Sequence, residues 1–190
     1  MRREPRTLGI LLLGALAGAL LGPPARGDDL APSSADRATP MQGPSTIRTL
    51  GDLVDLSAPQ LDQLYRQSGP GPVPLGKVNG RALYPDARFP RARSNAARIA
   101  WQGKVFRPES STAVNRFFGV RAIQGNVYAG PSWLDGGPSM VLDYQGTSKV
   151  YGNYRDEIRQ VAPGLYLGLM YDRTTAPPTL KMYFAFDSRP

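Results

Sequence analysis

Near its end the chain reads Leu165-Tyr-Leu-Gly-Leu-Met-Tyr171 and then Leu180-Lys-Met-Tyr-Phe-Ala-Phe186, and these two runs decide the fold class. The first run is apolar at nearly every position, which predicts a β-strand that is covered on both faces. The second run alternates, because successive side chains of a strand point to opposite faces. One face carries Leu180, Met182, Phe184 and Phe186, and the other carries Lys181 and Tyr183. A sheet with an interior and an outer covering layer is therefore predicted.

The same strand-like period extends back to Trp101 and is interrupted by turn residues. Glycine, proline and aspartate cluster between the apolar runs, as in Asp135-Gly-Gly-Pro138 and Pro163-Gly164, and such clusters end strands. Strands are predicted at 101–107, 120–129, 139–145, 149–160, 164–172 and 180–187. Residues 111–119 are interpreted as a short helix or an irregular crossover. Consecutive short antiparallel strands predict a mostly β (α+β) protein whose sheet closes into a small barrel or curves strongly.

One to three helices are predicted before the strands, at about 47–56 and 58–68 and within the basic segment described below. Ser57 and Gln60 form a capping box at the start of the second helix, and Gly69 stands where a C-terminal glycine cap belongs. The Gly/Pro-rich residues 69–80 are expected to be a loop. Residues 47–190 are thus expected to form one globular domain, helical over 47–100 and β over 101–187, with the helices over an open end or one face.

The first residues have the order of a secretory signal. Arg2, Arg3 and Arg6 precede an apolar run from Leu8 to Leu21, and small residues follow near Gly27. This order predicts a cleavable signal peptide at 1–27; the alternative, an anchoring helix, would need roughly 20 apolar residues. Residues 28–46 are rich in Pro, Ser, Ala and Asp and are expected to be a flexible leader. The predicted location is periplasmic or extracellular.

The absence of two residue types excludes several chemistries. The chain has no cysteine and no histidine, so disulfides, thiolate metal sites, Ser-His-Asp triads and histidine zinc sites are impossible. No catalytic residue, metal ligand or cofactor is predicted. The core alone must hold the fold, and a chain of 190 residues is long enough for that even after a signal is removed.

Positive charge is concentrated in residues 77–107, where Asp86 is the one acidic residue. Phe89, Ala92, Ala96, Ile99 and Ala100 fall roughly on one helical face within this segment. The candidate basic surface consists of Arg88, Arg91, Arg93, Arg98 and Lys104. One interpretation is a surface for an anionic membrane or an envelope polymer, and the other is an ordinary solvated helix. Nucleic acid is not expected as a partner of an exported protein.

Polar and aromatic residues of the second half are candidates for a ligand site. On the predicted strand 149–160, Asp156 sits on the more apolar face, and Asp143 on the neighbouring strand is positioned to pair with Arg155. A few polar groups in a mostly apolar cavity orient a small ligand. The candidate ligand-binding residues are Tyr128, Trp133, Asp143, Tyr144, Tyr154, Arg155, Asp156, Tyr166 and Tyr171. The alternative is an ion-pair ladder on a solvated sheet face, with the aromatic residues as core.

Three stretches resemble a lipocalin-like family of unknown function called GXWXG. They are Asn153-Tyr-Arg-Asp-Glu-Ile-Arg-Gln-Val161, Leu167-Gly-Leu-Met170 and Tyr183-Phe-Ala-Phe186. Gly76-Lys-Val-Asn-Gly80 keeps the family's glycine spacing, but Val78 stands where the family has tryptophan, and an Asp-His pair before the Arg-containing strand is absent. The resemblance is distant and covers roughly residues 58–187. It implies a small lipocalin-like barrel and no particular activity.

Three hypotheses of function follow. The first is an exported binding protein for a small apolar or lipid-like ligand. The second is an envelope-associated interaction protein that uses the basic segment 77–107. The third is a carboxylate-dependent hydrolase or isomerase that uses Asp143, Asp156 or Glu157, because neighbouring carboxylates can divide the acid and base roles. The first is preferred.

Overall fold

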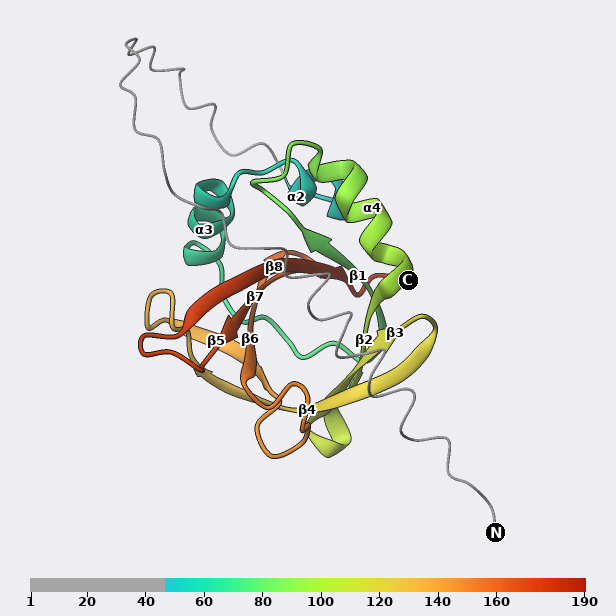
Figure 1. Cartoon of the computed structure of the whole chain (residues 1–190), viewed down its shortest axis with the longest axis vertical. Helices are drawn as coiled ribbons and strands as arrows, with labels where there is room; N and C mark the ends of the chain where they lie inside the picture. Colours follow the sequence, from blue (N-terminus) through green and yellow to red (C-terminus); the bar gives the residue numbers. More distant parts are fainter. Residues whose placement is uncertain (1–46) are drawn as a thin grey trace.

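Eight antiparallel strands form a closed barrel in a computed structural model that describes residues 47–190. Each strand is hydrogen-bonded to the next, and β8 pairs with β1 to close the sheet (Figure 1). The strands are β1 Gly76–Leu83, β2 Trp101–Arg107, β3 Thr112–Phe117, β4 Val120–Pro131, β5 Pro138–Asp143, β6 Tyr154–Ala162, β7 Leu165–Asp172 and β8 Thr179–Asp187. The predicted small barrel is confirmed, whereas the predicted signal peptide 1–27 and leader 28–46 lie outside the described residues.

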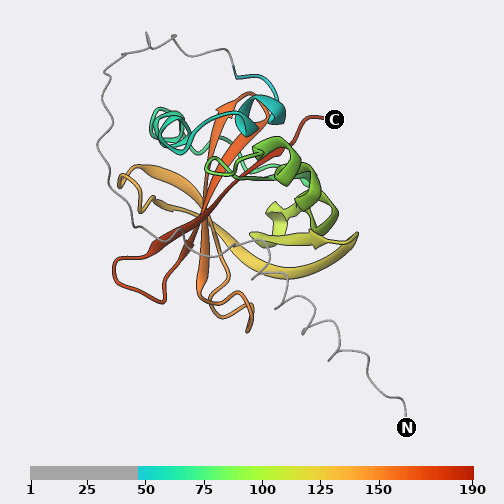
Figure 2. The same ribbon diagram turned by 45° about the horizontal axis from the view of Figure 1, so that its top comes forward.

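Three short helices lie outside the barrel wall. They are α2 Leu50–Val54, α3 Ala58–Arg66 and α4 Pro90–Ala100, and Figure 2 shows them together on one side of the barrel. The predicted capping box begins α3, where the Ser57 N–H donates to Gln60 Oε1 at 2.9 Å. Within residues 47–190, no helix is long and apolar enough to cross a membrane.

Two apolar clusters lie on the two sides of the wall. The interior one includes Phe106, Ile158, Tyr166, Phe184 and Phe186. The outer one joins Leu167 and Leu169 of β7 to Leu53 of α2 and to Leu61 and Tyr65 of α3. The prediction that 165–171 is covered on both faces is therefore confirmed. Each fully buried leucine stabilises the fold by about 1.5–3 kcal/mol relative to an exposed one, so the helices are held mainly by this outer cluster.

The predicted loop 69–80 and the helical assignment of 47–100 are wrong in part, because β1 begins at Gly76. This strand closes the barrel between β2 and β8. Gly80 is needed there because a Cβ atom would lie 2.6 Å from Gly103 Cα and 2.7 Å from the Trp101 ring. Gly80, which looks like a loop residue in the sequence, therefore allows close packing inside the sheet.

Two further differences arise from irregular pairing. The segment 111–119, predicted as helix or crossover, contains β3, whose inward positions include the polar Asn115 and whose register with β4 shifts beside it. In β8 the register with β7 shifts between Met182 and Leu180. Leu180 consequently packs with the outer cluster and not with Met182 on the interior face. Both irregularities interrupt the alternation of inward and outward side chains on which the strand predictions depend.

The predicted strand 149–160 begins later than expected, at Tyr154. The preceding residues form a turn, in which the N–H groups of Thr147 and Ser148 donate to the Tyr144 carbonyl. Tyr151 is buried and belongs to the interior cluster. The strand-like residues before Tyr154 thus fold over one end of the barrel.

Buried tyrosines make the fold sensitive to alkaline pH. Burial raises the pKa of six of them, and that of Tyr65 reaches about 12. The other five are Tyr144, Tyr151, Tyr166, Tyr171 and Tyr183. Unfolded tyrosines have a pKa near 10, so above that pH the unfolded state binds fewer protons than the folded state and is favoured.

We therefore expect the free energy of unfolding to fall above pH 10, by up to about 1.4 kcal/mol per pH unit for each tyrosine that stays protonated in the fold. Urea unfolding at a series of alkaline pH values measures this, with tyrosinate absorbance recorded in parallel. A flat stability profile, with tyrosinate forming before unfolding, would contradict the expectation.

Candidate functional site

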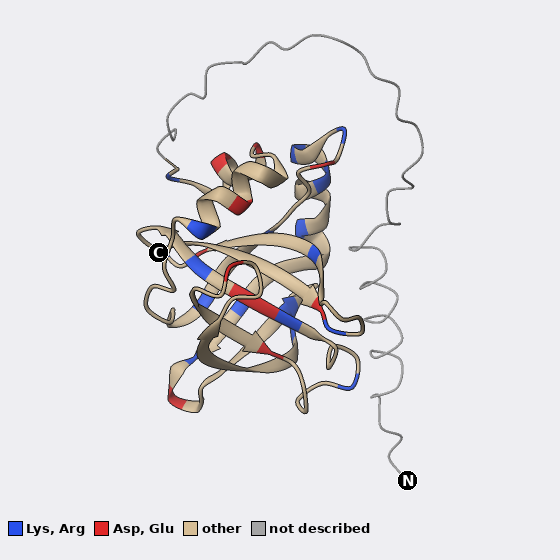
Figure 3. Cartoon of the chain, turned by 90° about the vertical axis from the view of Figure 1, so that its left-hand side faces the viewer, with Lys and Arg blue, Asp and Glu red and all other residues tan. Residues whose placement is uncertain are grey.

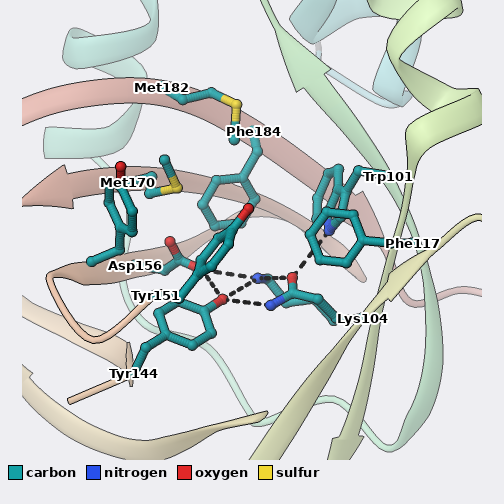
Figure 4. Close-up of a pocket in the computed structure, with 11 residues that line it drawn as sticks. Trp101, Lys104, Phe117, Tyr144, Tyr151, Asp156, Met170, Met182 and Phe184 are labelled. Atoms are coloured by element: carbon teal, nitrogen blue, oxygen red, sulfur yellow. Dashed lines mark hydrogen bonds and ion pairs between the residues drawn. The ribbon is translucent and has the colours of Figure 1, made fainter. Parts of the chain in front are cut away.

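A small pocket lies in the barrel interior (Figure 4). Its volume is about 30 Å³, which is more than the roughly 10–15 Å³ that a cavity needs to hold one water molecule. Its polar floor consists of Lys104, Asn115, Tyr144 and Asp156. Its aromatic walls consist of Trp101, Phe117, Tyr151, Tyr154 and Phe184, and two methionines, Met170 and Met182, complete it.

The floor is a buried hydrogen-bond network centred on Lys104. The ammonium group donates to Asp156 Oδ2 at 2.8 Å, to Asn115 Oδ1 at 2.9 Å and to the Tyr144 hydroxyl at 3.0 Å. The Tyr144 hydroxyl in turn donates to Asp156 Oδ2 at 2.8 Å. Trp101 Nε1 donates to Asn115 Oδ1 at 3.0 Å. All three ammonium protons are used, so Lys104 is fully satisfied without water.

A bulge explains how a lysine enters the interior. The register of β2 with β3 shifts between Trp101 and Gly103. Trp101 and Lys104 are three positions apart, so their side chains would point to opposite faces of a regular strand. Because of the bulge, both line the pocket. Gly103 has a φ of 114°, a conformation that glycine adopts without strain. Asn115 is the direct partner of Lys104 on β3.

The floor contains one positive and one negative side chain, and both are buried away from water. Lys104 and Asp156 are each 2% exposed. Burial lowers the pKa of Lys104, against the opposing effect of the Asp156 charge. Burial and the same carboxylate raise the pKa of Tyr144. Among the described residues, Asp156 Oδ1 is buried without a hydrogen-bond partner, so the pocket offers a ligand an unused acceptor on a charged group.

Aromatic rings pack around this floor. Trp101 meets Phe184 edge-on at 5.7 Å between ring centroids, and the Lys104 nitrogen lies 5.0 Å from the Phe184 ring. Tyr151 contacts both Tyr144 and Tyr154. Tyr154 and Met182 are only partly buried, so they lie where the pocket is nearest to solvent.

The structure brings three of the candidate ligand-binding residues to this pocket, namely Tyr144, Tyr154 and Asp156. Tyr166 is interior but lies elsewhere, stacked on Phe186 and donating to the Pro72 carbonyl at 2.8 Å. The remaining candidates, Tyr128, Trp133, Asp143, Arg155 and Tyr171, do not line it.

Those five residues lie together on the outer side of the wall, where the Trp133 ring meets Tyr171 edge-on at 5.5 Å between ring centroids. Asp143 and Arg155 are cross-strand neighbours, but the expected ion pair between them is wrong. Asp143 instead pairs with Arg173 at 2.6 Å and accepts a hydrogen bond from Tyr128 at 3.0 Å. The Arg155 guanidinium lies 4.3 Å from the ring of Trp133. Since Tyr171 belongs to the outer cluster, these residues form the outer side of the wall.

A second buried network lies on that outer side and fixes the connection between β4 and β5. Glu157 is fully buried, accepts from the Ser132 hydroxyl at 2.5 Å and from the Trp133 N–H at 2.9 Å, and has a pKa raised by burial. Arg159 pairs with Asp135 through two hydrogen bonds and donates to the Tyr65 carbonyl. This network ties the β4–β5 connection to β6 and to α3, so its role is structural.

The carboxylates proposed for catalysis do not converge. Charged residues crowd β6 (Figure 3), yet Asp156 belongs to the interior network, whereas its neighbour Glu157 binds the outer loop and Asp143 binds Arg173. No group of three metal-ligating side chains occurs in residues 47–190. Asp143, Asp156 and Glu157 therefore do not surround one common centre.

Sequence patterns predict only a small part of the pocket. The placement of Lys104 on the basic surface is wrong, because Lys104 is buried. Asn115 lies in the segment 111–119, which is predicted as a helix or crossover but contains a strand. One sequence signal does point to the pocket: a single lysine interrupts the otherwise apolar end of Trp101-Gln-Gly-Lys-Val-Phe106. Aromatic and methionine residues of the walls carry no such signal, because they look like ordinary core.

Comparisons with known proteins add little to this picture. No protein-family model matches the chain, and no curated protein matches it either. A solved structure described as "Crystal structure of protein from Thermomonospora curvata" is similar, with a TM-score of 0.49 and 16% sequence identity, over 72% of this chain and 90% of that chain. The resemblance to the GXWXG family stays a prediction, and any function has to be inferred from the pocket and the surface of this chain.

Proposed function

We propose that the protein is an exported binding protein whose barrel interior holds a small, mostly apolar ligand with one hydrogen-bond donor, such as an alcohol or an amine. The observation that carries the proposal is Asp156 Oδ1, a buried carboxylate oxygen in the pocket with no partner among the described residues. A buried acceptor without a partner costs free energy, and a ligand hydroxyl or ammonium group would remove that cost.

The walls support an apolar body for the ligand. Small-molecule sites are mostly apolar and contain a few placed polar groups, and this pocket combines the network around Lys104 with aromatic and methionine side chains. The cavity of about 30 Å³ is much smaller than the roughly 300–1,000 Å³ of usual small-molecule sites. A ligand therefore has to displace Met170 or Met182, whose unbranched side chains repack easily.

Export is part of the same proposal and rests on the sequence. The basic, apolar and small-residue order of residues 1–27 is that of a secretory signal. A barrel with two apolar clusters in a domain of this size can be stable outside the cell without a disulfide.

We expect native mass spectrometry of the gently purified protein to show an added small mass that disappears on denaturation. Met182→Trp should abolish it by filling the pocket where it is nearest to solvent. The matched control is Lys181→Trp on the same strand, because Lys181 is exposed and does not line the pocket. Loss of the added mass in both variants would contradict binding in the barrel.

A second measurement tests whether the ligand needs a hydrogen-bond donor. Short apolar alcohols and amines should raise the unfolding temperature, and hydrocarbons of equal size should bind at least about tenfold more weakly, since a site built for a polar group rejects the analogue that lacks it. Equal stabilisation by polar and apolar compounds would overturn the proposal. So would the absence of stabilisation by either class, if the mass spectrum also shows only the free protein.

A further inference from the structure

Helix α4 turns its apolar stripe away from the protein. The buried residue of this helix is Ser94. On the opposite side, Phe89 at the N-cap is 65% exposed and Ile99 is 70% exposed. Ala92 and Ala96, which lie between them on the same face, are exposed as well. A helix that only covered the barrel would bury this stripe, and contiguous exposed apolar side chains mark interaction surfaces.

Arginines border the stripe. Arg88, Arg91, Arg93 and Arg98 are all exposed, and no acidic residue occurs from Ala87 to Pro108. Arg91 pairs with Asp55, and Arg93 lies over the Tyr84 ring at 4.4 Å, so these two are held in place. Arg88 and Arg98 make no ion pair within residues 47–190.

An open cleft of about 820 Å³ adjoins the helix. Three arginines from different elements line it: Arg81 of β1, Arg98 of α4 and Arg116 of β3. The other lining residues include Asn79, Asn95, Gln102 and Ile99, and none is acidic. Arg116 Nη1 is buried and has no hydrogen-bond partner among the described residues. The pKa of Arg81 is lowered first by burial and then by the charges of Arg98 and Arg91. The cleft therefore concentrates donors and positive charge.

We propose that α4 and the arginine cleft beside it form a docking surface for an anionic lipid membrane. Phe89 and Ile99 enter the boundary between headgroups and acyl chains, and a lipid phosphate binds between Arg81, Arg98 and Arg116. Guanidinium groups bind phosphate oxygens in a bidentate fork. Helices with an apolar stripe and basic flanks lie in the membrane interface.

The apolar stripe selects a lipid membrane over the other anionic partners. A soluble phosphate or an anionic polymer would use the arginines, but it would leave Phe89 and Ile99 exposed to water. Ile99 lines the cleft, so one residue joins the apolar stripe to the phosphate site. The surface lies outside the barrel, and its role is independent of the interior ligand.

The test is flotation of the full chain with vesicles of phosphatidylcholine alone or mixed with phosphatidylglycerol. We expect binding to the mixed vesicles and at least tenfold weaker binding to the neutral ones. Added salt should reduce the binding, because exposed charge contacts are screened. The double variant Arg98→Gln/Ile99→Ser should reduce binding at least tenfold, and Phe89→Ser should reduce it without changing the salt dependence.

The matched control is Lys149→Gln/Val150→Ser. It likewise removes one positive charge and one branched apolar side chain at two adjacent exposed residues, in the turn between β5 and β6, which lies far from α4 (Figure 2). This variant should float with the anionic vesicles as the wild type does. All variants should keep the wild-type unfolding temperature, because the substituted side chains are exposed.

Three outcomes would overturn the proposal. Binding of glycerol phosphate or polyphosphate by the wild type, without vesicle binding, would identify a soluble anion as the partner. Vesicle binding that survives Phe89→Ser and Arg98→Gln/Ile99→Ser would place the contact elsewhere. Equal binding to neutral and anionic vesicles would exclude the phosphate site.

Discussion

Replacing Lys104 by methionine will destabilise the protein by about 3–5 kcal/mol, because the substitution leaves Asp156 buried without its counter-ion. Methionine has nearly the length of lysine, so little packing is lost. The loss comes from the carboxylate, which is 2% exposed and whose Oδ2 would retain only the Tyr144 hydroxyl as a donor. Asn115 Oδ1 would keep the Trp101 donor.

The double variant Lys104→Met/Asp156→Leu should recover most of this stability. Replacing a buried ion pair by apolar residues of similar volume is often neutral or stabilising, whereas removal of one partner is costly. The recovery will be incomplete, because the Tyr144 hydroxyl loses its acceptor while it still receives a hydrogen bond from Asn115 at 2.8 Å. The two substitutions are thus expected to be strongly non-additive.

Urea unfolding of the two single variants and the double variant measures the coupling. Lys181→Met is the matched control, because Lys181 is exposed and lies 3.9 Å from Asp172. Such a surface pair contributes about 0–1 kcal/mol. If Lys104→Met costs no more than this control, the interior pair does not hold the barrel, and solvent must reach Asp156.

The double variant also separates stability from function. It should keep the barrel while removing the acceptor that selects a donor on the ligand. Alcohols and hydrocarbons of equal size should then stabilise it equally. A preference for alcohols that persisted in this variant would show that another polar group orients the ligand.

Local patterns were enough to predict the parts of the fold that follow regular geometry. The apolar run of β7 predicted a strand buried on both faces, and the capping box at Ser57 predicted the start of α3. Both depend on residues close together in the sequence, where alternation and helix-end chemistry decide the outcome. Closure of the barrel was one of two alternatives, because it depends on β1 pairing with a strand near the other end of the chain.

The pocket could not be predicted in the same way. Its inward side chains depend on bulges in β2 and β3, which change the face that a residue occupies. Lys104 reads as a surface residue until Asp156, 52 residues later, is known to lie beside it. The outward orientation of α4 was equally hidden, since an apolar stripe normally predicts the buried face of a helix.

Phe184→Ala should cost about 3–5 kcal/mol, the usual range for removing a buried aromatic ring. Phe184 is 1% exposed and packs against Trp101 and the Lys104 ammonium. Its ring lies over Gly168, its cross-strand partner on β7, and a Cβ atom at that glycine would overlap the ring. Gly168→Val alone should therefore destabilise the protein, by about 1–3 kcal/mol for overpacking of this kind.

In the Phe184→Ala background the same Gly168→Val substitution should change sign and stabilise the protein. The valine methyl groups would then fill part of the space that the ring leaves, and a smaller residual cavity costs less. Urea unfolding of the four proteins of this cycle gives the coupling energy. Phe186→Ala serves as the control background, because Phe186 stacks on Tyr166 and is paired with Gly80 and not with Gly168. A valine at 168 that is equally harmful in every background would mean that strand backbone strain, and not the Phe184 ring, requires glycine there.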